Sequence, residues 1–191
     1  MEISTVHRAD DRDLNTLRSG FQCYNGEWAL KNNVENARSF LKKLIDPDHD
    51  ISKLPDFPQE VLKPVPIIFK KGATKNKTLI DVMATIKRVL KDYRAFWVST
   101  SVNQECGGMK RKHKYKIDIP TPLKQYQIVN SDKGNSLMKI DDRTDIMIPS
   151  ICLDSDLLDS SKIIAINSGP IDDAEISFLT SIPKNWITDI T

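Results

Sequence analysis

The segment FWVSTSV, residues 96–102, marks the point where the character of the sequence changes. Its mixture of aromatic, β-branched and small polar residues is typical of a β-strand. Five further runs of this kind follow, broken by clusters of Gly, Pro, Asn and Asp: KYKIDIP (114–120), YQIVN (126–130), IMIPSICL (146–153), KIIAIN (162–167) and EISFL (175–179). We therefore expect the second half of the chain to form a mostly antiparallel β-sheet.

Helical patterns dominate the sequence that precedes this segment. Apolar residues recur at helical spacing over residues 27–45, and again over residues 78–93. Five prolines between residues 46 and 77 predict a long irregular connection, with a brief strand at VPIIF (65–69). Because helices come early and strands come late, the pattern indicates an α+β fold.

The N-terminal region VHRADDRDLNTLRSGF, residues 6–21, interleaves basic and acidic residues densely for a chain terminus. The preceding ISTVH, residues 3–7, predicts a short first strand. Residues 11–19 are expected to form a short helix. It would end at Gly20, because glycine readily adopts the left-handed conformation common at helix ends.

Composition bounds the class of protein. A chain of 191 residues with 39% hydrophobic and 28% charged residues is expected to fold as one domain, 1–191. Its 28 Lys and Arg against 26 Asp and Glu give a net charge of +2, which favours neither a nucleic-acid nor an anionic membrane partner. No apolar run approaches the roughly 18 residues of a membrane span. We find no signal-peptide pattern in the chain.

The three cysteines, Cys23, Cys106 and Cys152, are odd in number and widely spaced. This spacing predicts neither a disulfide framework nor a metal site, so three free thiols are expected. A single bridge between Cys23 and one of the others is the alternative. Cys106 precedes two glycines and lies near His113, but this arrangement matches no catalytic pattern.

Two short patterns offer groups for chemistry. Side chains alternate across a strand, so Ser99 and Ser101 would share one face while Thr100 points to the other. Asp173 and Glu175 would likewise share a face, with carboxylates roughly 6–7 Å apart. Paired acids can divide the work of proton transfer and charge stabilisation. Taken singly, a polar strand face and a solvated acidic loop explain these patterns more simply.

Three segments in order give a more specific signal. HRADDR (7–12) followed by GF (20–21), then YRAFWVSTS (93–101), then DDAEISFLTSIP (172–183) together resemble the motifs of the cholera-toxin-like, Arg-Ser-Glu class of mono-ADP-ribosyltransferases. KYKIDIPTPLKQYQIVN (114–130) is similar to the strand pair that this family places between its second and third motifs. Residues 22–95 match only through their helical character.

The resemblance implies a split, twisted two-sheet β core, with the helices of the N-terminal half packed on it and NAD held in its cleft. It implies an enzyme that cleaves NAD and transfers ADP-ribose to a macromolecular acceptor, without a metal. Such a protein would be a bacterial or phage toxin or effector. It would be secreted or delivered into the target-cell cytoplasm, with a delivery partner or a cognate immunity protein.

The resemblance also assigns roles at the reacting centre. Breaking the bond between nicotinamide and ribose develops positive charge on the sugar, as in glycoside hydrolysis. Glu175 would stabilise that charge and hold the ribose 2′-hydroxyl. Ser99 would orient Glu175 and the ribose, and Thr100 and Ser101 would support the same strand and help to bind NAD.

On the first motif, Arg8 would contact the ribose-phosphate part of NAD, for which a guanidinium is well suited. Asp10 and Arg12 would steady Arg8 or line the same cleft. In the arginine-modifying members the residue two before the catalytic glutamate is also glutamate, whereas here it is Asp173. The shorter acid still favours a protein arginine as the first candidate acceptor, from a host or competitor cell.

Other interpretations remain open on the sequence alone. The basic run MKRKHKYK, residues 109–116, predicts either contact with a nucleic-acid acceptor or a solvated strand edge protected by lysines. The protein could be an NAD glycohydrolase or an inactive NAD-binding relative. A small partner-binding protein, such as a toxin antagonist, is the alternative of another class.

Overall fold

The computed structural model describes residues 2–23, 28–46, 97–131, 134–140, 150–167 and 175–191. Several predictions lie outside these ranges: the second helix at 78–93, the connection from 47 to 77, and Asp173.

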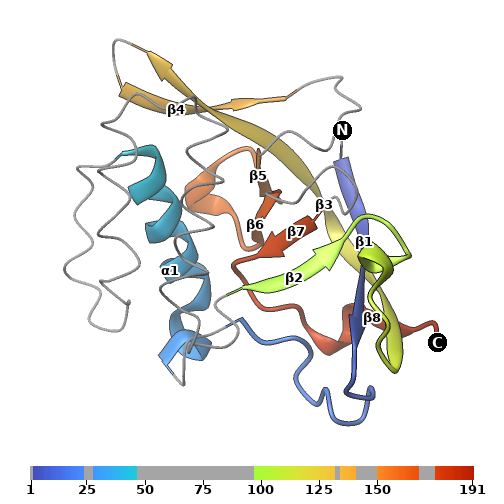
Figure 1. Ribbon diagram of the computed structural model, residues 1–191. Helices are drawn as coiled ribbons and strands as arrows, with labels where there is room; N and C mark the ends of the chain where they lie inside the picture. The colour runs from blue at the N-terminus through green and yellow to red at the C-terminus, as the bar shows by residue number, and fades with distance from the viewer. Residues whose placement is uncertain (1, 24–27, 47–96, 132–133, 141–149, 168–174) are drawn as a thin grey trace.

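The described part of the chain is mostly β (Figure 1). Its helix, α1, spans Trp28–Ile45 and confirms the helix predicted over residues 27–45. Its eight strands are β1 (Glu2–Asp10), β2 (Val98–Ser101), β3 (His113–Ser131), β4 (Gly134–Lys139), β5 (Ser150–Leu153), β6 (Ile164–Asn167), β7 (Glu175–Phe178) and β8 (Ile187–Asp189). Within the described ranges, no helix is long and apolar enough to cross a membrane.

The strand pairing closes on itself. The order β1-β2-β7-β6-β5-β3 returns to β1 through a direct β1–β3 pairing, so six strands form a closed barrel. Strands β4 and β8 pair with β3 outside this ring. Every pairing is antiparallel, as the sequence predicts. The expected split into two sheets is replaced by one continuous ring of pairings.

The long strand β3 pairs with both β1 and β5, and the prediction of two separate strands at 114–120 and 126–130 is wrong. Pro120 and Pro122 indicate a break between KYKIDIP and YQIVN. The β1–β3 register explains why the strand continues, because Asp118 pairs with Thr5 and Leu123 with Ile3. Residues 119–122 therefore form an irregularity opposite a single residue of β1, where proline's missing N–H is tolerated.

The helix predicted over residues 11–19 is wrong, since this segment consists of turns. Short acidic side chains capture its backbone instead: the N–H of Arg12 donates to Asp10 (3.1 Å) and that of Thr16 to Asp13 (2.7 Å). Such local bonds compete with helix formation. The left-handed Gly20 is confirmed, with φ +81°, and a Cβ there would lie 2.0 Å from the Ile182 carbonyl oxygen.

Both faces of the ring are covered where β5 and β6 lie. Their residues are buried along the full length of each strand. One face belongs to an apolar core that includes Phe21, Tyr115 and Phe178. The helix α1 contacts β6 and β4, and it lies beside the barrel in Figure 1. By contrast, Arg8 on β1, Ser99 on β2 and Glu175 on β7 are only half-buried.

Candidate active site

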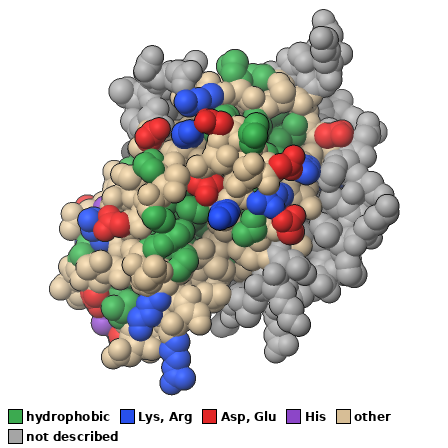
Figure 2. Space-filling model, turned by 180° about the vertical axis from the view of Figure 1, so that it is seen from behind, with side chains coloured by type: hydrophobic (Ala, Val, Ile, Leu, Met, Phe, Trp, Pro, Cys, Tyr) green, Lys and Arg blue, Asp and Glu red, His purple; other side chains and the backbone are tan. Residues whose placement is uncertain are grey.

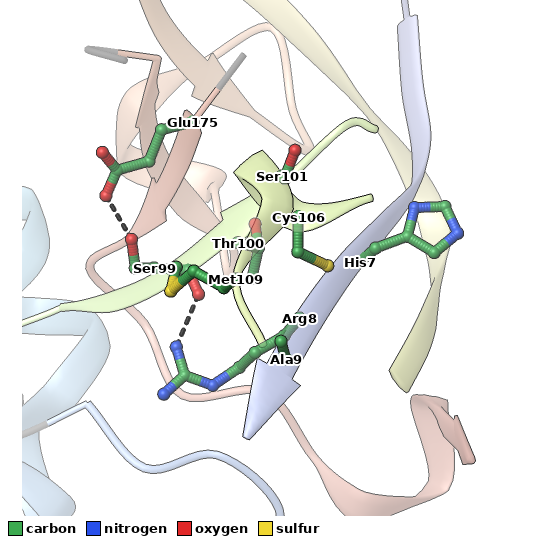
Figure 3. Close-up of a pocket in the computed structure, with 9 residues that line it drawn as sticks. All are labelled: His7, Arg8, Ala9, Ser99, Thr100, Ser101, Cys106, Met109 and Glu175. Carbon is green, nitrogen blue, oxygen red and sulfur yellow. Dashed lines mark hydrogen bonds between the residues drawn. The ribbon is translucent and has the colours of Figure 1, made fainter. Parts of the chain in front are cut away.

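Segments far apart in the sequence form a pocket where β1, β2 and β7 meet (Figure 3). It is lined by His7, Arg8, Ala9, Ser99, Thr100, Ser101, Cys106, Met109 and Glu175. Five of these residues belong to the predicted site: Arg8, Ser99, Thr100, Ser101 and Glu175. Each of the three sequence motifs therefore contributes to one pocket.

The centre of the pocket is the pair Ser99 and Glu175. The β2–β7 register places Ser101 opposite Glu175 and Ser99 opposite Ser177. The Ser99 hydroxyl donates a hydrogen bond to Glu175 Oε1, as Figure 3 shows. Both side chains are half-buried. A serine thus holds the carboxylate while leaving it accessible from the pocket.

Arg8 bridges the first motif to the second. Its Nη1 donates to the backbone carbonyl of Ser99 at 2.6 Å, and its Nε and Nη2 donate to Asp10 Oδ2 at 3.2 and 3.1 Å. The guanidinium carbon lies 4.9 Å from the ring centroid of Phe21, within range of a cation–π interaction. Burial lowers the pKa of Arg8, although the charge of Asp10 opposes this shift. Arg8 stays protonated at neutral pH.

Asp10 is the hub of the charges behind the pocket. Arg12 donates to both of its carboxylate oxygens, from Nε and Nη2 at 2.8 Å each. Burial by itself would raise the pKa of Asp10, but hydrogen bonds from Arg12 and the charge of Arg8 outweigh it and hold this pKa well below its usual range. Of the two predicted roles, steadying Arg8 fits Asp10, since the residues lining the pocket do not include it.

The other two residues of the STS strand have distinct contacts. Thr100 faces the opposite way to Ser99, as predicted, and its hydroxyl donates to the carbonyl of Ile176 at 2.8 Å. It therefore fastens β2 to β7. The hydroxyl of Ser101 accepts the N–H of Asn103 at 3.0 Å. That either residue binds NAD stays a prediction.

Sequence reasoning missed several contributors. Cys106, which has φ +50°, and Met109 enter the pocket from the turn between β2 and β3. Ser177 donates to Glu175 Oε1 at 3.2 Å. The Tyr115 hydroxyl donates to the carbonyl of Arg12 at 2.6 Å and so fixes the turn that carries this arginine. Of these, only Ser177 had a sequence signal, because it lies two residues after Glu175 on the same strand face.

The cysteines are free, so the alternative bridge from Cys23 is wrong. Burial raises the pKa of the Cys23 and Cys152 thiols to about 12. It also raises the pKa of Cys106, the thiol that lines the pocket. All three are therefore protonated at neutral pH and poor nucleophiles.

The basic run 109–116 is largely compensated by acids. Arg111 pairs with Asp11 at 2.8 Å and Lys114 with Glu105 at 3.3 Å. Its last residues are not a strand edge, since residues 115–117 pair with both β1 and β8, so that interpretation is wrong. Figure 2 shows a face on which positive and negative side chains are interspersed. The ion pairs of the 109–116 run do not favour a nucleic-acid acceptor.

The described residues contain no group of three or more His, Cys, Asp or Glu side chains placed to hold a metal ion. The second predicted acid, Asp173, lies outside the described residues. No protein-family model matches this chain, and no curated protein sequence matches it either. The site is therefore interpreted from its own geometry and chemistry.

Proposed function

We propose that this protein is an NAD-dependent ADP-ribosyltransferase, with Glu175 as its catalytic carboxylate. The observation that carries the proposal is the convergence of Arg8, Ser99 and Glu175 around one pocket, linked by hydrogen bonds from Arg8 to Ser99 and from Ser99 to Glu175. These residues come from three motifs that are distant in the sequence. Three motifs that matched by coincidence would not be expected to place their residues around one pocket.

The arrangement suits cleavage of the bond between nicotinamide and ribose. As this bond breaks, its electron pair leaves with nicotinamide and C1′ of the ribose becomes cationic. A fixed carboxylate beside C1′ stabilises that cation more in the transition state than in bound NAD. A nucleophile of the acceptor then bonds to C1′ and loses its proton, which completes the transfer.

Arg8 would supply the positive charge for the phosphate portion of NAD. Three of its five N–H groups have partners in the described residues. A guanidinium held by a carboxylate and a carbonyl is oriented before the ligand arrives, so little entropy is lost on binding. The described residues combine an antiparallel sheet with the helix α1, and that they form a twisted ADP-ribosyltransferase core remains part of this proposal.

For the acceptor we propose a protein arginine, in a host or competitor cell, with the chain acting as a toxin or effector. Asp173 would supply the anion that attracts the guanidinium. The ion pairs of the 109–116 segment favour this acceptor over a nucleic acid.

The direct test is release of nicotinamide from NAD by the purified protein. We expect release by the wild type and transfer of labelled ADP-ribose to a protein in a cell lysate, identified by mass spectrometry. Release without transfer to any macromolecule would support an NAD glycohydrolase instead. A protein that neither cleaves nor binds NAD would refute the proposal and favour a partner-binding protein.

A further inference from the structure

We propose that Ser177 is a second positioning residue for Glu175, in addition to Ser99. This inference rests on the proposed function, because it concerns the geometry of the carboxylate that would face NAD. It assigns a role to a residue that the three motifs do not include as a functional position.

The β2–β7 register creates the arrangement. Ser177 lies two residues after Glu175, so both side chains project from the same face of β7, and Ser99 pairs directly with Ser177 across the strands. Both serine hydroxyls donate to the same oxygen, Glu175 Oε1, the Ser177 bond measuring 3.2 Å. Two donors from two strands restrict rotation of the carboxylate better than either donor alone.

The two serines differ in their access to a ligand. Ser99 is half-buried and lines the pocket, whereas Ser177 has 0% of its surface exposed and is not part of the lining. A bound ribose can therefore exchange hydrogen bonds with Ser99 but cannot reach Ser177. A fully buried hydroxyl is costly without a partner, and Glu175 is the partner that the structure gives Ser177. Ser177 thus holds the carboxylate throughout the reaction cycle.

This difference predicts distinct kinetics for the two serines. Ser177→Ala should lower kcat for nicotinamide release about tenfold, the effect of losing one hydrogen bond to a charged group, with KM for NAD within about twofold of the wild type. Ser99→Ala should change both kcat and KM. Ser177→Cys, which keeps the size and a weak donor, should give an intermediate kcat.

The matched control is Ser150→Ala. Ser150 is also a strand serine, 1% exposed, and its hydroxyl donates to the Gln125 side chain at 3.0 Å, away from the pocket. It should lose comparable stability while retaining wild-type kcat. A kcat for Ser177→Ala equal to that of the wild type, or a fall equal to that of Ser150→Ala, would overturn the inference and leave the proposed function standing.

A second measurement does not depend on turnover. Urea unfolding of Ser177→Ala, Glu175→Ala and the double variant forms a double-mutant cycle, and we expect the double variant to lose less stability than the sum of the single losses. Additive losses would overturn the contact itself. If the wild type releases no nicotinamide, the proposed function fails and with it the role of Ser177 in positioning a catalytic carboxylate, and a non-additive cycle would then establish only the structural contact.

Discussion

Two carboxylates, Asp10 behind the pocket and Glu175 in its lining, are held in different ways. Asp10, on β1, receives hydrogen bonds from two guanidinium groups and is nearly buried, with 9% of its side chain exposed. Glu175, on β7, receives hydrogen bonds from the hydroxyls of Ser99 and Ser177 and is half-buried. The donors to Asp10 are cationic guanidinium groups, whereas Ser99 and Ser177 give Glu175 hydrogen bonds from hydroxyl groups.

Under the proposed function, this contrast would separate a structural carboxylate, Asp10, from a reactive one, Glu175. The charge of Asp10 is balanced by the arginines that it orients, so little of it remains to act on a ligand. The hydroxyl donors Ser99 and Ser177 carry no charge, so these two hydrogen bonds orient Glu175 without themselves neutralising it. A carboxylate held in this way is suited to a reaction in which positive charge appears only in the transition state.

The largest effect is expected for Glu175→Gln, which tests whether the charge of Glu175 is required. It keeps the shape and the acceptor oxygen but removes the charge, so nicotinamide release should fall about a hundredfold to a thousandfold. The urea midpoint of unfolding should stay close to that of the wild type. A variant that retains more than half of the wild-type rate would contradict a catalytic role for this carboxylate.

Asp10→Asn tests the opposite behaviour. Removing one partner of a buried charge pair leaves Arg8 uncompensated, so unfolding free energy should fall by about 3 kcal/mol. The adjacent Asp11→Asn is the matched control, because the Asp11–Arg111 pair is about half exposed and should contribute at most about 1 kcal/mol. Equal losses in the two variants, measured by urea unfolding, would contradict the hub role of Asp10.

Arg8→Lys tests the connection that Arg8 makes between Asp10 and Ser99. A lysine keeps the charge but cannot bond to Ser99 and Asp10 with a fixed planar fork. We expect KM for NAD to rise about tenfold through the loss of one such charged hydrogen bond. Circular dichroism should show an unchanged fold. An unfolded variant would point to a purely structural role for Arg8.

The smallest effect concerns pH. The native pKa of Asp10 lies below its unfolded value of about 3.9, so its contribution to stability is complete above that value and is lost as the pH falls below it. The stability difference between the wild type and Asp10→Asn should therefore be constant from pH 5 to 7, roughly, and shrink below about pH 4. A stability difference that grows as the pH falls would contradict a lowered native pKa for Asp10.

The sequence could predict the members of the site better than their roles. Motif residues can be recognised by their type and their order in the sequence. Three of them, Arg8, Ser99 and Glu175, line one pocket as predicted. Strand alternation places Ser177 beside Glu175, but the hydrogen bond from Ser99 to Glu175 depends on strand register and that of Tyr115 on a turn, neither of which a single strand pattern contains.

The fold shows the same limit. The sequence predicts two strands in place of β3, because a proline usually ends a strand. Only the pairing with β1 reveals the irregularity that accommodates the prolines. Strands β4 and β8 were missed because Gly134–Lys139 lacks regular alternation and Ile187–Asp189 is only 3 residues long. Closure into a ring is a property of all the pairings together, which no local segment encodes.

The closed ring has a consequence for synthesis on the ribosome. Strand β1 emerges before the other strands of the ring, its partners β2 and β3 follow only after the α1-containing region, and β7 with Glu175 is the last strand of the ring to be made. Translation is slow relative to local folding, so β1 waits unpaired for much of elongation. Arg8 and Glu175 therefore meet only after residue 175 has been translated, and a chain terminated before that residue has no assembled site.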